Sequence, residues 1–303
     1  MAITLNDRIN DLLSNPKPSK IGVFSVHDSY ATCYRGVGRK KVTDEQLAVL
    51  KQNWGKVEYS GNISNNTKRK IRTMLTGWSR ALITYNRLHG LSASKEGRRI
   101  VFVTLTLPSK QIHSDNEIKR ACLSLFLSNI IRLTGVKYYY WKAESQQNGN
   151  IHFHLLLDSF VHKSLINYYW DKALSNLGYI DVPSDFNLNY RSPSTKIEAP
   201  RNSSSTAIYV VKYCLKDDGH RKIDGRIWGC SDELRNIPKL SVDLTDEYML
   251  LLNKGEKLKK ITIIPNVYCD VYVGNVYGLL FDLSPTFRDE ADSFYYEVYH
   301  SLY

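Results

Sequence analysis

The 303-residue sequence lacks several features that would assign it to common classes of protein. No apolar run approaches the ~20 residues of a transmembrane helix, and the first residues do not show the basic-then-apolar pattern of a secretory signal. The 5 cysteines are widely spaced and form no C-x-x-C pair, so neither a zinc ribbon nor a disulfide framework is indicated. There is no G-x-x-x-x-G-K-[ST] motif and no internal repeat. We therefore expect a soluble, cytoplasmic protein that does not bind membranes and carries no P-loop ATPase.

The composition is that of a globular protein with an uneven distribution of charge. Hydrophobic residues make up 43% of the chain and aromatic residues 12%, which is enough to bury a core. The net charge is +11, yet Ser231–Tyr303 holds 7 basic and 12 acidic residues, and Met1–Cys230 holds 34 basic and 18 acidic residues. A basic excess of this kind favours a polyanionic partner, although it also serves solubility.

The periodicity of apolar residues predicts strands and helices in mixed order, and hence an α+β fold. Ile100–Leu107 alternates, is rich in β-branched residues and stops at Pro108, as a strand does. Two further strands are expected at Val136–Glu144 and Ile151–Asp158. Helices are expected after Ser64, from the Ser114-x-x-Glu117 capping box to Leu133, over Leu165–Leu177 and at the acidic C-terminus; strand-like stretches lie near residues 21–26, 261–264 and 271–281.

The helix expected after Ser64 is amphipathic and basic. Ile71, Leu75, Trp78 and Leu82 fall at helical spacing, while its six lysines and arginines are spread over the other faces. Such a helix either contacts phosphate or presents a solvated charged face.

Two histidines of the segment HFHLLL, His152 and His154, are the first candidates for chemistry. Side chains alternate along a strand, so both imidazoles project from one face while Phe153 and Leu155 pack on the other. An H-x-H pair on a strand is more often structural or exposed than metal-binding, and a hard divalent cation also requires a carboxylate.

Glu144 is the candidate carboxylate, and the register of the hairpin decides whether it qualifies. A three-residue loop with Gly149 in the left-handed conformation pairs Glu144 with His152, on the histidine face. A two-residue Asn148-Gly149 turn, which the sequence also favours, sends Glu144 to the opposite face. Gln146 shares a face with Glu144 and is the alternative ligand.

The segment YVVKYCLK places two tyrosines and two lysines on one stripe of an expected helix. Tyr209, Lys212, Tyr213 and Lys216 follow i, i+3, i+4, i+7 spacing. A phenol with a pKa near ~10 is a weak nucleophile, and neighbouring lysines favour tyrosinate or neutralise charge on a phosphoryl group. Half-buried tyrosines with snorkelling lysines produce the same pattern without any chemistry.

In combination and in this order, VFVTLTLP, HFHLLL and YVVKYCLK make the chain resemble the HUH endonuclease superfamily. The resemblance is to the rolling-circle replication initiators of small single-stranded DNA phages and related plasmids, and it covers about Val101–Lys216. The segment GRIWGCSDEL at 225–234 looks like one that follows the tyrosine helix in phage members. The spacing of Tyr209 and Tyr213 resembles that of the branch with two nucleophiles.

The resemblance implies a fold, an activity and a set of site residues. The fold would be a central antiparallel sheet, an HUH/RRM-like palm, flanked by helices with smaller N- and C-terminal additions. His152, His154 and Glu144 would bind Mg²⁺ or Mn²⁺, and Tyr209 and Tyr213, with Lys212 between them, would nick single-stranded DNA at an origin. The protein would form a 5′-phosphotyrosine link and rejoin the strand to release circles, with a separate helicase and polymerase supplied by the host.

We expect three parts: an N-terminal extension (1–60), an endonuclease domain (61–235) and a C-terminal α/β extension (236–303). Three other functions fit parts of the pattern. They are a related single-strand transposase or relaxase, a non-catalytic binder that stacks bases on aromatic residues such as Tyr138–Trp141, and a metallohydrolase that releases a free phosphate end.

Overall fold

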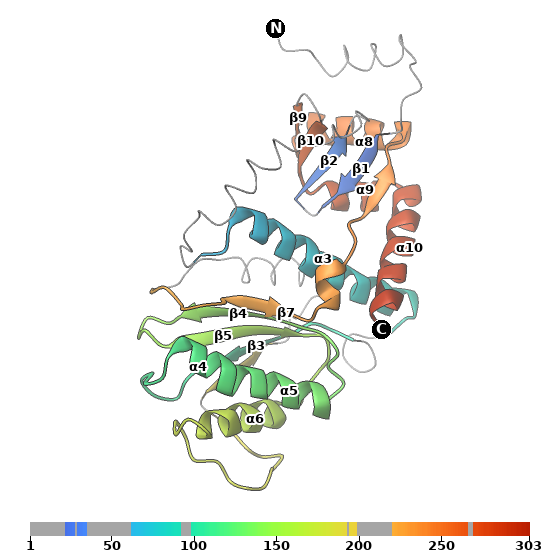
Figure 1. Cartoon of the computed structure of the whole chain (residues 1–303). Helices are drawn as coiled ribbons and strands as arrows, with labels where there is room; N and C mark the ends of the chain where they lie inside the picture. The colour runs from blue at the N-terminus through green and yellow to red at the C-terminus, as the bar shows by residue number, and fades with distance from the viewer. Residues whose placement is uncertain are drawn as a thin grey trace, which may run out of the picture. The chain divides into compact units, whose positions relative to one another are not determined.

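The structure is a computed structural model with an α+β fold, as expected from the sequence. It contains two antiparallel sheets of five strands each, with helices packed on them (Figure 1). The residues that it describes are 22–27, 29–34, 62–91, 98–192, 194–198, 220–265 and 269–303.

The chain divides into two compact units. The first consists of Met1–Gln52 and Lys239–Phe294, and the second of Asn53–Pro238 and Tyr295–Tyr303. The expected division into three parts at residues 60 and 235 remains a prediction. The candidate ligands His152, His154 and Glu144 all lie in the second unit.

The second unit is built on a sheet with the strand order β6-β3-β5-β4-β7. In sheet order its strands are β6 (Thr195–Glu198), β3 (Val101–Leu105), β5 (Ile151–Leu157), β4 (Tyr139–Ser145) and β7 (Trp228–Cys230). The expected VFVTL and HFHLLL strands therefore lie side by side, and every neighbouring pair is antiparallel. β5 is the central strand, so the histidine pair lies in the middle of the sheet.

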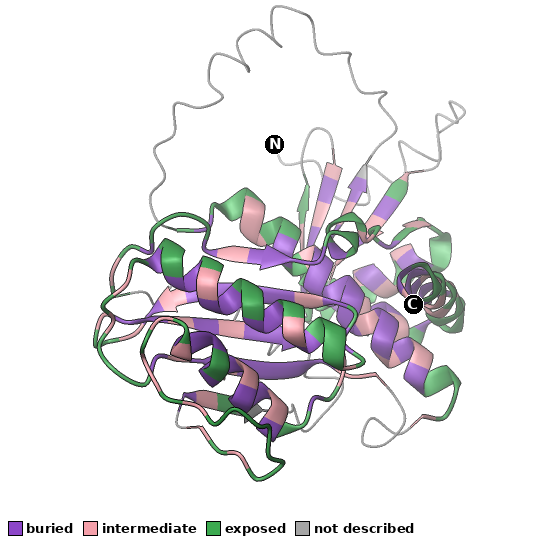
Figure 2. Cartoon of the chain, turned by 60° about the horizontal axis from the view of Figure 1, so that its bottom comes forward, coloured by how far each residue is buried: buried purple, intermediate pink, exposed green. Residues whose placement is uncertain are grey.

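One face of this sheet packs against a pair of helices. A continuous helix comprises α4 (Asp115–Ile118), a π-helical segment (Lys119–Leu123) and α5 (Ser124–Leu133); α6 (Lys163–Ser175) packs beside it. The Trp170 ring makes edge-to-face contacts with Phe126 and with Phe153 of β5. Figure 2 shows the outward side of α5 exposed and the strands behind it largely buried. This face is the core of the unit.

The basic helix expected after Ser64 is α3 (Asn65–Leu88). The Ser64 side chain caps it by accepting a hydrogen bond from the Thr67 amide. All four apolar residues at helical spacing are buried, which confirms the predicted stripe: Ile71, Leu75, Trp78 and Leu82. Figure 1 shows α3 on the side of the sheet opposite α5 and α6.

The first unit has its own sheet, in the order β8-β1-β2-β10-β9. Its elements are β1 (Val23–Val26), β2 (Tyr30–Tyr34), β8 (Ser241–Asp243), α8 (Asp246–Lys257), β9 (Ile261–Pro265), β10 (Cys269–Gly274), α9 (Val276–Leu283) and most of α10 (Pro285–Leu302). The strand-like stretches near residues 21–26 and 261–264 are confirmed as β1 and β9.

The strand-like stretch at 271–281 is only half right, because β10 ends at Gly274 and α9 follows. The Asn275 side chain accepts a hydrogen bond from the Gly278 amide and caps α9. Alternating apolar residues and a short apolar run fit either structure, and the cap resolves the ambiguity. None of the helices formed by described residues is both long enough and apolar enough to cross a bilayer.

Candidate metal centre

The β4–β5 hairpin adopts the three-residue loop that places Glu144 with the histidines. The Gln146 amide donates to the Asn150 carbonyl at 2.8 Å, and Gly149 has φ +84°, a left-handed conformation that glycine adopts without strain. Glu144 therefore pairs with His152, and Lys142 pairs with His154. The tighter Asn148-Gly149 turn does not form.

The four polar side chains of these pairs lie on one face of the sheet, opposite the face that packs on α6. Phe153 and Leu155 are fully buried, whereas the side chains of His152 and His154 are 13% and 16% exposed. The Glu144 side chain is 12% exposed. The site is shielded by its surroundings but remains accessible to solvent.

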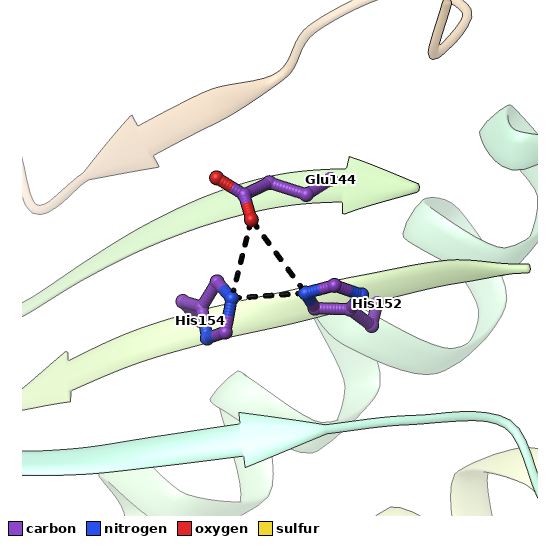
Figure 3. A group of neighbouring side chains, drawn as sticks. All are labelled: Glu144, His152 and His154. Carbon is purple, nitrogen blue, oxygen red and sulfur yellow. Dashed lines mark hydrogen bonds and ion pairs between the residues drawn. The ribbon is translucent and has the colours of Figure 1, made fainter. Parts of the chain in front are cut away.

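Three ligand-type atoms converge at the centre of the site (Figure 3). The Nε2 atoms of His152 and His154 are 2.9 Å apart, and Glu144 Oε2 lies 3.7 Å from the first and 3.3 Å from the second. Among the described residues, these three form the group of histidine, cysteine and acidic side chains with a geometry suited to a metal ion.

The geometry and the donor set fit a divalent cation. Ligands next to one another around an octahedral ion with bonds of about 2.1 Å are separated by about 3 Å, close to the observed spacings. Two neutral imidazole nitrogens and a carboxylate oxygen all present lone pairs, and a shared cation removes their mutual repulsion. Imidazole with carboxylate is a donor set used for divalent metals from Mn²⁺ to Zn²⁺.

The protonation states also suit metal binding. Burial lowers the pKa of His152 to about 4, so its ring is neutral at pH 7. Burial alone would raise the pKa of Glu144, but hydrogen bonds from His154 and Lys142 outweigh it and lower the pKa to about 2. The site thus presents a carboxylate beside a neutral imidazole at physiological pH.

Three neighbours of the ligands were not predicted from the sequence. Lys142 is buried and its Nζ donates to Glu144 Oε1, which leaves Oε2 turned toward the histidines. The Thr104 hydroxyl lies 3.2 Å from His154 Nδ1, and the Phe102 ring stacks on the imidazole. If Nδ1 donates its hydrogen to Thr104, Nε2 carries the lone pair that faces Glu144. Strand alternation, which places Lys142 on the Glu144 face, was the available signal for this lysine.

A network of long-range hydrogen bonds holds the hairpin loop. Arg221 Nε donates to the Gly149 carbonyl at 2.6 Å, and its guanidinium makes a bidentate ion pair with Asp115, with both N–O distances 2.7 Å. The Gln111 side chain accepts from the Ile151 amide, and the Asn150 side chain donates to the Ser109 carbonyl. Residues of four separate segments therefore fix the loop on which the register depends.

The remaining site predictions lie outside the described residues. They are the two candidate nucleophiles and the two lysines of the expected tyrosine helix: Tyr209, Tyr213, Lys212 and Lys216. Their roles stay predictions. The role of Gln146 as an alternative ligand stays open as well.

Comparison with known proteins gives one match. Residues 100–218 match a family model described as replication-associated protein ORF2. No curated protein and no solved structure is significantly similar to the chain. The matched range contains β3, both ligand strands and the YVVKYCLK segment. The match supports a replication-associated protein of the rolling-circle type.

Proposed function

We propose that this protein initiates rolling-circle replication by nicking and rejoining single-stranded DNA through a tyrosine. The observation that carries the proposal is the convergence of Glu144 with His152 and His154 within a range that matches replication-associated proteins. The basic charge of Met1–Cys230 supports a nucleic-acid partner.

Glu144, His152 and His154 would hold Mg²⁺ or Mn²⁺ at the site. The bound ion supplies Lewis acidity to a non-bridging oxygen of the scissile phosphate. Thr104 and Lys142 would orient two of the ligands: Thr104 through His154 Nδ1, and Lys142 through Glu144 Oε1.

Tyr209 or Tyr213 would be the nucleophile. Its phenolic oxygen bonds to phosphorus as the bond from phosphorus to the 3′ oxygen of the preceding nucleotide breaks. The phenol loses its proton and the departing oxygen gains one, which leaves a 5′-phosphotyrosine and a free 3′-OH. Lys212 and Lys216 would neutralise charge on the phosphoryl oxygens.

Rejoining would be the reverse reaction. A 3′-OH attacks the phosphotyrosine, the phosphodiester re-forms and the tyrosine regains its proton, so no ATP is consumed. Two tyrosines would allow one to cut a new junction while the other still holds the first 5′ end. Strand separation and synthesis would come from a separate helicase and polymerase.

Replacing the tyrosines tests this proposal. Circular single-stranded DNA that carries candidate origins is incubated with Mn²⁺ and the full chain, and protease-sensitive adducts are resolved on denaturing gels. Tyr209→Phe and Tyr213→Phe together are expected to abolish the adduct, while Tyr169→Phe on α6 serves as the matched control and retains it.

Other outcomes of the same assay support different functions. Adducts that persist in the double variant would refute the assignment of the nucleophiles. Cleavage without any adduct indicates a metallohydrolase. Binding without cleavage that survives His152→Ala indicates a non-catalytic binder.

A further inference from the structure

Helix α3 carries an unusual distribution of charge. Its 24 residues include no acidic side chain. Four of its six cations are concentrated in the first two turns: Lys68, Arg69, Lys70 and Arg72.

This placement does not stabilise the helix. Cations near the N-terminus of a helix oppose its macrodipole, and no acidic residue occupies the first turn. Lys68 and Arg72, four residues apart, and Arg69 and Arg72, three apart, are also like-charged neighbours on the helix surface. By contrast, Arg87 lies in the last turn, where the macrodipole favours a cation. Binding of a polyanion at the first two turns would offset both unfavourable effects.

The charges are displayed on a firmly anchored element. Ile71 and Leu75 are almost fully buried, while Arg69, Lys70 and Arg72 are exposed. The ion pairs that join described residues include none of these three cations. The helix is therefore held by its apolar stripe, and the cations face solvent.

The basic end of α3 lies toward the candidate metal centre. The second half of α3 is fixed at the other end of the sheet, because Trp78 Nε1 donates to the Tyr303 hydroxyl, which donates to Asp158 just after β5. The first half runs from there toward the β4–β5 hairpin, on the side of the sheet away from α5 and α6 (Figure 1). Strand alternation places the side chains of His152 and His154 on that same side.

We propose that the first two turns of α3 bind the phosphate backbone of the single-stranded DNA that is cut at the metal centre. The proposal rests on the proposed function for the identity of the nucleic acid. Lysine and arginine contacts to phosphates position a strand without reading its sequence. They would hold the DNA on either side of the nick, so that one phosphate lies at the Glu144 carboxylate and the imidazoles.

The salt dependence of DNA binding tests this surface. The variant Arg69→Gln/Lys70→Gln/Arg72→Gln is titrated with a fluorescent 30-nucleotide single strand of mixed sequence, in EDTA, over a range of NaCl concentrations. Loss of three phosphate contacts is expected to reduce the slope of log K against log [salt] by about 2 and to weaken binding by about 10- to 100-fold near 0.15 M salt.

The matched control removes the same charge elsewhere. Lys254→Gln/Lys257→Gln/Lys260→Gln changes three exposed lysines at and just after the end of α8 in the acidic first unit, and is expected to leave the slope unchanged. Equal losses in the two triple variants, or an unchanged slope in the α3 variant, would overturn the proposal. Should the triple variant fold poorly by circular dichroism, Arg72→Gln alone is expected to lower the slope by about 0.7.

The test is independent of nicking and discriminates between nucleic acids. Binding in EDTA requires no metal and no covalent step, so a reduced slope supports the α3 surface even if no adduct forms in the tyrosine assay. An adduct with an unchanged slope supports the proposed function and refutes the α3 surface. A duplex of the same sequence that binds more tightly, and loses more affinity on substitution, would assign the surface to double-stranded DNA and contradict the proposal.

Discussion

Lys142 and Glu144 share one face of β4, and their contact divides the work of the carboxylate between its two oxygens. One oxygen accepts from the buried ammonium, and the other faces the histidines. Since a buried charge is stabilised mainly by such partners, Lys142 keeps the carboxylate ionised in a partly desolvated site. The geometry therefore favours Glu144 as the third ligand and leaves Gln146 outside the converging group.

The two candidate third ligands are distinguished by their substitutions. Glu144→Gln keeps the shape of the side chain but removes its charge, and we expect Mn²⁺ affinity to fall by at least about tenfold. Gln146→Ala is the matched control and is expected to retain the affinity. Isothermal titration with Mn²⁺ measures both. The reverse order of affinities would assign the third ligand to Gln146.

At the scale of the element, the β4–β5 hairpin shows why a register is hard to predict. The Asn148-Gly149 dipeptide fits both a two-residue turn and a three-residue loop with Gly149 left-handed. The structure selects the longer loop through Arg221, which is 72 residues away in sequence and donates to the Gly149 carbonyl. Local sequence predicts both strands correctly, whereas the alignment of their faces depends on distant side chains.

The ion pair that holds this loop is expected to make the fold sensitive to acid. Burial raises the pKa of Asp115, but hydrogen bonds from Arg221 and Gln111 outweigh it and lower the pKa from 3.8 to about 2. A lowered pKa stabilises the folded state above the ordinary value, and that stabilisation is lost as the pH falls through the folded-state value.

Asp115→Asn removes this contribution. The free energy of unfolding of the unchanged protein is expected to exceed that of the variant at neutral pH, and the difference is expected to shrink by about 2 kcal/mol between about pH 4 and pH 2. Urea unfolding at a series of pH values measures the difference. Asp185→Asn, at an exposed position, is the control. A difference that does not change with pH would contradict this role of Asp115.

At the scale of the whole molecule, the end of the chain is part of the second unit. The Tyr303 hydroxyl donates to Asp158 at 2.8 Å, and the Arg98 guanidinium lies over the Tyr303 ring. Burial raises the pKa of Asp158, and the Tyr303 hydroxyl and Arg98 counteract that effect. The last residues of α10 thus complete a buried polar cluster, which an apolar pattern in the sequence does not reveal.

Tyr303→Phe leaves Asp158 without one hydrogen bond. We expect the variant to lose about 1–3 kcal/mol of the free energy of unfolding in urea, the usual effect of depriving a buried polar group of a partner. Tyr296→Phe, on the same helix, is the matched control and should change stability by less than about 0.5 kcal/mol. Equal effects in the two variants would show that the hydroxyl does not stabilise this cluster.

The sequence was informative in proportion to how local each feature is. The strand alternation of HFHLLL and the helical spacing from Ile71 to Leu82 predicted elements and buried faces that the structure confirms. The α9 helix was missed because a short apolar run fits both kinds of secondary structure. Thr104 was missed as a partner of His154, since only the pairing of β3 with β5 brings the two together.

The most direct test of the metal centre is pulsed electron paramagnetic resonance of the protein with one equivalent of Mn²⁺. The geometry of Glu144, His152 and His154 predicts nitrogen couplings from two imidazoles, and one imidazole after either His152→Ala or His154→Ala. Spectra that show no imidazole nitrogen, or that stay the same when both histidines are replaced, would contradict the assignment of this site.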